Sequence, residues 1–222
     1  MIIPYTKALL VRPRFDEPTQ HSFAFAGEIL QWCRQAKPLI VDVIELAEGE
    51  AIRARVEQEL TPDVDLFIFY DHGDEDALIG QDEKPVIDLE NAGLLAGKEV
   101  FTLACLSAKD LGPAVWRQGG TYWGYVDVFS FTTDSLAEFQ EAANCGFKFR
   151  FIEGDTRQNS LQRAKETFTR LALELVDAGK VFAAICMRED GDTLVYLDAH
   201  KPEEKEGCLL ALLKLPVSLL RR

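Results

Sequence analysis

The chain has 222 residues, of which 47% are hydrophobic, so it is long enough to bury the core of one large domain. Its 5 cysteines are scattered without metal-ligand spacing, which indicates neither a disulfide framework nor a zinc site. The formal net charge of −13 opposes phosphate backbones and argues against nucleic acid as a ligand. No signal-like N-terminus and no membrane-length apolar run is present. We therefore expect a cytoplasmic protein with no membrane span, no metal and no other cofactor.

Strand and helix patterns alternate through the first half of the chain. Four apolar strands are expected, at residues 6–13, 38–46, 65–70 and 100–104. A helix capped by His21 or Ser22 follows the first strand, and residues 48–60 form the next helix. Residues 74–98 are read as a long irregular segment with a short helix near residues 89–95. This alternation predicts right-handed βαβ units, and hence an α/β fold with a mostly parallel sheet covered by helices on both faces.

The second half of the chain extends this core. A fifth strand is expected at residues 121–128, followed by a helix that Asp134 caps and a longer helix that starts at Asn159 or Ser160. Residues 191–199 and 207–216 flank a charged loop and predict a C-terminal antiparallel hairpin. We treat residues 1–222 as a single domain, with a core at 7–127 and a helical and hairpin extension at 128–222.

Two reactive side chains follow two apolar strands. His72 ends "DLFIFYDH" and Cys105 ends "EVFTLAC". The carboxyl ends of neighbouring parallel strands lie about 5 Å apart at one edge of a sheet, so the two side chains can face each other there. An imidazole beside a thiol can take its proton and so create a nucleophile. Gly73 lets the backbone turn tightly, and the amides of Gly73 and Cys105 are candidates for an oxyanion hole.

In these residues the chain resembles the caspase-like cysteine peptidases, a group that includes caspases, gingipain, clostripain, legumain, separase and bacterial CHAT domains. "FIFYDHG" and "FTLACLS" carry the resemblance, which covers about residues 7–127, and "ACLS" followed by "GGTYWGY" is most similar to the CHAT and gingipain members. The resemblance implies a three-layer sandwich and a cysteine endopeptidase with His72 and Cys105 as its catalytic pair. Ala104 and Leu106 flank the cysteine, which departs from the signature of true caspases and does not imply their aspartate specificity.

Loops at the same edge of the sheet should contact the substrate. The candidate substrate-binding residues are Arg14, Asp16, Asp71, Asp74, Asp127 and Phe131. In the resembled group a charged residue near the end of the first strand often selects the side chain before the scissile bond. "RPRFDE" offers both signs there, and the acidity of the chain favours a basic substrate read by Asp16. Asp71 and Asp74 flank His72 and can orient its imidazole.

Ordinary roles also account for these residues, since a cysteine at a strand end is commonly buried packing. Two functions therefore remain open. The first is a cysteine endopeptidase that acts on a protein or peptide substrate, with a regulatory protein as a further expected partner. The alternative is a catalytically inactive adaptor that binds a peptide or protein in the same cleft. A small-molecule domain of the flavodoxin type is disfavoured, because no glycine-rich phosphate loop follows the first strand.

Overall fold

The computed structural model describes residues 5–35 and 40–199. A central sheet has the strand order β2-β1-β3-β7-β8-β9, in which only β9 runs antiparallel to its neighbour. The strands are β1 (Tyr5–Arg12), β2 (Ile40–Ala47), β3 (Leu66–Tyr70), β7 (Glu99–Leu103), β8 (Thr121–Tyr125) and β9 (Leu194–Asp198). The predicted mostly parallel sheet is confirmed. Residues 207–216, the expected second strand of the hairpin, lie outside the described residues.

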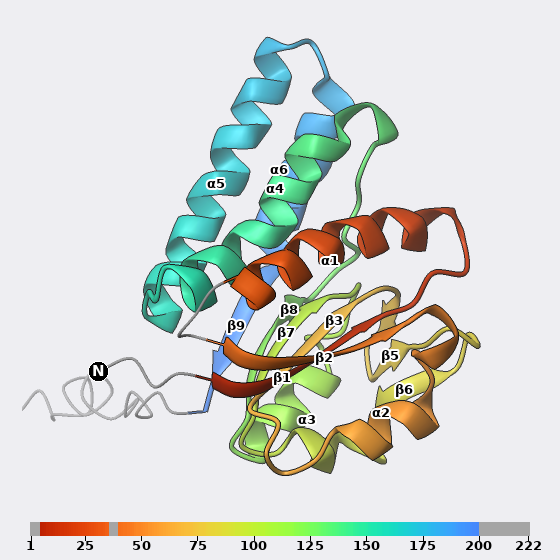
Figure 1. Cartoon of the computed structure of the whole chain (residues 1–222). Coiled ribbons are helices and arrows are strands. Elements are labelled where there is room, and N and C mark those ends of the chain that lie inside the picture. Colours follow the sequence, from red (N-terminus) through yellow and green to blue (C-terminus); the bar gives the residue numbers. More distant parts are fainter. Residues whose placement is uncertain (1–4, 36–39, 200–222) are drawn as a thin grey trace, which may run out of the picture.

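Helices cover both faces of the sheet (Figure 1). One face carries α1 (Glu17–Gln35), α4 (Leu136–Phe147), α5 (Arg157–Asp177) and α6 (Val181–Thr193), and the other carries α2 (Arg53–Glu59) and α3 (Leu111–Arg117). Successive side chains of a strand point to opposite faces. Tyr70 of β3 therefore packs into the core beneath α1 and α4, while Phe69 packs into the opposite core. The sheet is the middle layer of the predicted three-layer sandwich. No helix within residues 5–35 and 40–199 is long and apolar enough to cross a membrane.

The segment between β3 and β7 is more regular than expected. It forms an antiparallel three-stranded sheet of β4 (Gly73–Asp74), β5 (Ala77–Ile79) and β6 (Pro85–Asp88). A 3₁₀ segment, η2 (Ala92–Leu95), stands where the short helix was expected. The prediction of an irregular segment is wrong, because strands of two to four residues are too short to show the alternation that identifies a strand.

Helix α1 starts earlier than the sequence predicted. It begins at Glu17, and the Asp16 carboxylate accepts a hydrogen bond from the Thr19 amide at 2.8 Å. The Thr19 hydroxyl in turn accepts from the Asp16 amide at 2.9 Å, which makes a reciprocal cap. The predicted cap at His21 or Ser22 is therefore wrong, because Asp16 is the first residue whose side chain meets the free amides of the helix.

Two other helix starts also differ from the prediction. Thr156 caps α5 by accepting from the Asn159 amide at 3.2 Å, so the expected caps Asn159 and Ser160 lie inside the helix. Before α4, the Asp134 carboxylate accepts from the hydroxyls of Thr132 and Ser135 instead of from helix amides. A short 3₁₀ segment, η3 (Thr133–Ser135), leads into α4, which begins without a side-chain cap.

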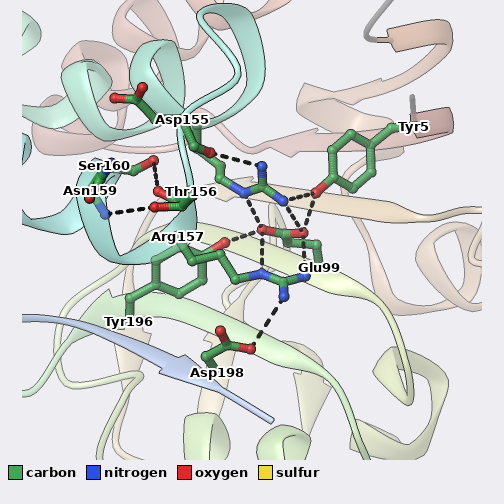
Figure 2. Close-up of polar contacts among 10 residues, drawn as sticks. Tyr5, Glu99, Asp155, Thr156, Arg157, Asn159, Ser160, Tyr196 and Asp198 are labelled. Carbon is green, nitrogen blue, oxygen red and sulfur yellow. Dashed lines mark hydrogen bonds and ion pairs between the residues drawn. The ribbon is translucent and has the colours of Figure 1, made fainter. Parts of the chain in front are cut away.

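A buried charge cluster joins the layers at the amino-terminal edge of the parallel strands (Figure 2). Glu99, the first residue of β7, is 4% exposed and pairs with Arg150 and Arg157, each at 3.0 Å. The hydroxyls of Tyr5 and Tyr196 also donate to Glu99. Burial alone would raise the pKa of Glu99, but the two guanidinium groups lower it to about 2. The cluster ties β1, β9 and α5 to the centre of the sheet, and Arg150 adds the π-helical segment η4 (Lys148–Ile152).

Candidate active site

A cavity of about 460 Å³ opens at the carboxyl-terminal edge of the sheet, and both His72 and Cys105 line it. β3 and β7 are neighbouring parallel strands with Tyr70 opposite Leu103, so the residues that follow them emerge side by side. The first turns of α1 and the segment after β8 complete the walls, with His21 and Phe131 among the lining residues. A thiol and an imidazole therefore share one cavity that also has room for part of a ligand.

A strained turn presents Cys105 at the end of β7. Leu106 has a φ of +60°, a left-handed conformation that costs a non-glycine residue about 1 kcal/mol or more. Its amide donates to the Asp127 carbonyl at 3.1 Å, and the Ser107 hydroxyl donates to the Ala104 carbonyl at 3.0 Å. These bonds hold the chain in the turn, and nothing in the sequence signals the left-handed residue.

Gly73 is required by the close approach of the two strand ends. A Cβ atom at this position would lie 2.7 Å from the Cys105 carbonyl oxygen and 2.9 Å from the Ala104 Cβ. Any larger residue would push the segment after β3 away from the segment after β7. The glycine that follows His72 therefore keeps the imidazole and the thiol on neighbouring backbones.

The imidazole of His72 is held by Asp16, 56 positions earlier in the sequence. His72 Nε2 lies 2.8 Å from Asp16 Oδ2, while the other carboxylate oxygen caps α1. Slight burial opposes ionisation, but hydrogen bonds from Thr19 and His72 hold the pKa of Asp16 below its usual value. An ionised carboxylate only accepts hydrogen bonds, so Nε2 carries a proton, and in the neutral ring Nδ1 is the nitrogen with the lone pair. Asp16, and neither Asp71 nor Asp74, is the carboxylate partner of the ring.

The thiol of Cys105 is partly buried and lies against the segment after β8. Its Sγ contacts the Phe129 carbonyl at 3.8 Å. Burial raises the pKa of Cys105 above its usual value. The resting side chain is therefore a protonated thiol, which needs a base before it can act as a nucleophile.

Asp71 is a buried carboxyl at the cavity with one oxygen unused. It is 6% exposed, and its Oδ1 accepts from the His72 amide at 2.6 Å. Its Oδ2 has no hydrogen-bond partner among the described residues, and burial raises its pKa to about 8. Asp71 is therefore protonated at neutral pH, and it is one of the residues that line a cavity with mostly apolar walls.

The other candidate residues take different positions. Arg14 pairs with Glu48 at 2.5 Å, Asp74 is exposed on β4, and Asp127 is exposed with its carboxylate on the Val128 amide. None of the three lines the cavity. Phe131 does, and its ring packs 5.5 Å from the ring of His21. His21, which the sequence suggested as a helix cap, lines the cavity from the start of α1, five residues after Asp16.

Within residues 5–35 and 40–199, no three His, Cys, Asp or Glu side chains are grouped so that they could hold a metal ion. The chemistry available at this edge of the sheet is that of a thiol, an imidazole and carboxyl groups.

Comparison with known proteins identifies the fold. No protein-family model and no curated protein matches the sequence. Among solved structures, the complex of Porphyromonas gingivalis RgpB pro- and mature domains superposes with a TM-score of 0.53 and 11% identity, over 86% of this chain and 46% of that chain. The crystal structure of the Arg specific cysteine proteinase gingipain R (RGPB) gives a TM-score of 0.52 and 11% identity, over 86% and 45%. The chain spans less than half the length of either structure. At this identity the likeness defines the fold alone, which is the caspase-like fold of the gingipains.

Proposed function

We propose that the protein is a cysteine peptidase in which Cys105 is the nucleophile and His72 is the general base. The observation that carries the proposal is that both side chains line one cavity at the carboxyl-terminal edge of two adjacent parallel strands. The caspase-like fold, shared with two cysteine proteinase structures, supports the same reaction class.

The reaction follows from the groups at the cavity. Nδ1 of His72 accepts the thiol proton as Cys105 attacks the scissile carbonyl, and Asp16 stabilises the imidazolium that forms. The amides of Gly73 and Cys105 would stabilise the oxyanion. His72 then gives its proton to the leaving amine, which leaves an acyl group on the sulfur. Water, deprotonated by His72, hydrolyses this thioester and restores the thiol.

Cleavage after a basic residue is the specificity that the cavity supports best. Glu17 and Asp71 line the cavity, and no Lys or Arg does so among the described residues. One neighbour is itself named as Arg specific. Both oxygens of Asp16 already accept hydrogen bonds, one from His72 and one from Thr19. Asp71 therefore replaces Asp16 as the residue that we propose binds the basic side chain of the substrate. A guanidinium placed beside the Asp71 carboxyl would lower its pKa and form a charge-assisted pair.

The test uses a peptide library and then matched substrates. Wild type should cleave library peptides and Cys105→Ala should not. Two fluorogenic peptides that differ only in Arg or Asp before the scissile bond then measure specificity. Asp71→Asn should raise KM for the Arg peptide about tenfold, whereas Asp74→Asn, at an exposed carboxylate outside the cavity, should leave it unchanged. Preferential cleavage of the Asp peptide would contradict this proposal and indicate that the protein cleaves after acidic residues.

A non-catalytic adaptor is favoured by one observation, the protonated thiol that lies against the Phe129 carbonyl. Such a protein would bind peptides in the cavity and release them intact. A regulatory protein that covers the cleft fits either function, and one neighbour is described as a complex of pro- and mature domains. Likeness to CHAT-domain proteases and a cytoplasmic location stay predictions.

A further inference from the structure

Asp190 is a second buried carboxyl with an unused oxygen, and it belongs to α6, outside the residues assigned to the reaction. It is 0% exposed. Its Oδ1 accepts a hydrogen bond from the Ser130 amide at 2.9 Å, and its Oδ2 has no hydrogen-bond partner within residues 5–35 and 40–199. A fully buried carboxyl with a single bond contributes little to stability. Among the described residues its side chain has one hydrogen bond, with a backbone amide of the cavity wall, which points to a role at the site.

The wall that Asp190 holds is the one that contacts the nucleophile. Phe129, Ser130 and Phe131 line the cavity, and the Phe129 carbonyl accepts from the Cys105 thiol at 3.8 Å. The Ser130 amide, which Asp190 fixes, belongs to the peptide unit that contains this carbonyl. One rigid peptide plane therefore separates the carboxyl from the sulfur, and any displacement of the Ser130 amide moves the acceptor of the thiol.

Asp190 belongs to a helix whose position is fixed by close packing. A Cβ atom at Gly191 would lie 2.7 Å from the Cβ of Phe168, so α6 packs closely against α5 next to Asp190. Further along, the Val126 amide donates to the Thr193 carbonyl at 3.0 Å, which ties the start of the same wall to the end of α6. The end of α6 thus fixes the wall at two points, and its position does not depend on a loop.

We propose that Asp190 is a positioning residue that holds the Phe129–Ser130 peptide against Cys105 and so sets the burial and the reactivity of the thiol. Its expected effect on turnover rests on the proposed function, whereas its effect on thiol reactivity does not.

The substitution Asp190→Ala should separate reactivity from catalysis. Without the Asp190 carboxyl, the Ser130 amide loses its acceptor and the Phe129–Ser130 peptide can move away from Cys105. Water then reaches the thiol, and the thiolate becomes easier to form. Alkylation of Cys105 by iodoacetamide at pH 7 should then rise at least about threefold, because the thiolate is the reacting species. Peptide turnover should fall, because the sulfur is no longer held in place. Asp190→Asn keeps the acceptor oxygen and should match wild type in both assays, and Asp192→Ala, at an exposed carboxylate on the same helix, should do the same.

The measurement is the alkylation rate of each cysteine, resolved by mass spectrometry, with a thermal melt of each variant. Cys33, Cys145 and Cys186 are buried and serve as internal references. A rise confined to Cys105 in Asp190→Ala, restored in Asp190→Asn, supports the role. A wild-type rate at Cys105 in a folded Asp190→Ala variant overturns it, as does an equal rise in Asp190→Asn.

If Asp190→Ala unfolds and all cysteines react, the proposal is tested instead by comparing the alkylation of Cys105 in Ser130→Pro and Ser130→Ala. Proline removes the amide donor and leaves α6 unchanged, while alanine keeps the donor. Faster alkylation of Cys105 in the proline variant alone supports the role, and equal rates in the pair contradict it. If no variant, including wild type, cleaves peptides while the alkylation contrast persists, the proposed function fails and the positioning role stands.

Discussion

The two edges of the central sheet bury carboxyl groups in opposite ways. At the amino-terminal edge Glu99 meets two guanidinium groups and two tyrosine hydroxyls, and its pKa falls to about 2. At the carboxyl-terminal edge Asp71 and Asp190 each accept one amide bond and meet no cation in the described part of the chain, and burial raises the pKa of each to about 8. Burial is similar in all three, so the neighbouring cations decide the difference.

This difference separates a structural region from the region that we propose is reactive. The bonds of the Glu99 cluster are satisfied within the protein, as in a region that holds layers together. The other edge keeps free polar oxygens, a left-handed Leu106 and a partly exposed thiol. Unsatisfied groups and local strain cost stability and commonly gather where a ligand or a reaction uses them.

The largest expected effect is at the reactive edge. Cys105→Ala and His72→Ala should each lower peptide turnover by about 10⁴-fold or more, because each removes a group that takes part in bond making. Both residues are only partly buried, so thermal melts should change little. Cys186→Ala, which removes a side chain that is 5% exposed, should lower stability and leave turnover unchanged. Measurable activity in Cys105→Ala would place the nucleophile elsewhere.

The opposite edge should give the opposite result. Glu99→Gln leaves two guanidinium groups without their carboxylate, and we expect a loss of about 3–5 kcal/mol in the free energy of unfolding. Alkylation of Cys105 should stay at the wild-type rate, because the cluster and the thiol lie at opposite ends of β7. Chemical denaturation measures the first effect. Glu90→Gln, at a side chain that is 86% exposed, is the control and should cost almost nothing.

Asp16 offers a smaller and more selective test. Asn is as good a helix cap as Asp, so Asp16→Asn should preserve α1 while it weakens the partner of His72. We expect kcat to fall about 10- to 100-fold with little change in KM, because Asp16 acts on the imidazolium and not on the bound substrate. A rise in KM confined to Arg peptides, with kcat unchanged, would instead indicate that Asp16 binds the basic side chain of the substrate.

The most gradual expected effect is the slope of stability against pH. The pKa of Asp71 rises from 3.8 to about 8 on folding, and that of Asp190 does the same, so between these values the folded protein keeps protons that the unfolded chain releases. Their contribution is complete below about pH 4 and is lost as the pH rises to about 8, by at most about 1.4 kcal/mol per pH unit for each carboxyl. Urea unfolding at several pH values should show a flatter profile in the double variant Asp71→Asn, Asp190→Asn. An unchanged profile would mean that neither carboxyl is protonated in the folded protein.

Much of the fold could be predicted from the sequence because the parallel strands are continuous apolar runs. β3 and β7 are buried on both faces, and parallel strands deliver His72 and Cys105 to one edge. The partners of these residues could not be predicted. The contacts of Asp16 with His72 and of Ser130 with Asp190 join residues 56 and 60 positions apart, and no periodicity encodes such pairs. The short strands β4 to β6 were missed because they show no alternation.

The most direct test of the central claim is the rate at which iodoacetamide alkylates Cys105 at pH 6 in wild type and in His72→Ala. Burial alone keeps this thiol protonated, so a rapid reaction would require a nearby base, which we propose is His72. The account predicts that Cys105 reacts much faster than the buried cysteines in wild type and that His72→Ala lowers its rate at least about tenfold. Equal rates for Cys105 in the two proteins would contradict a His72–Cys105 pair and leave the adaptor as the function of this cleft.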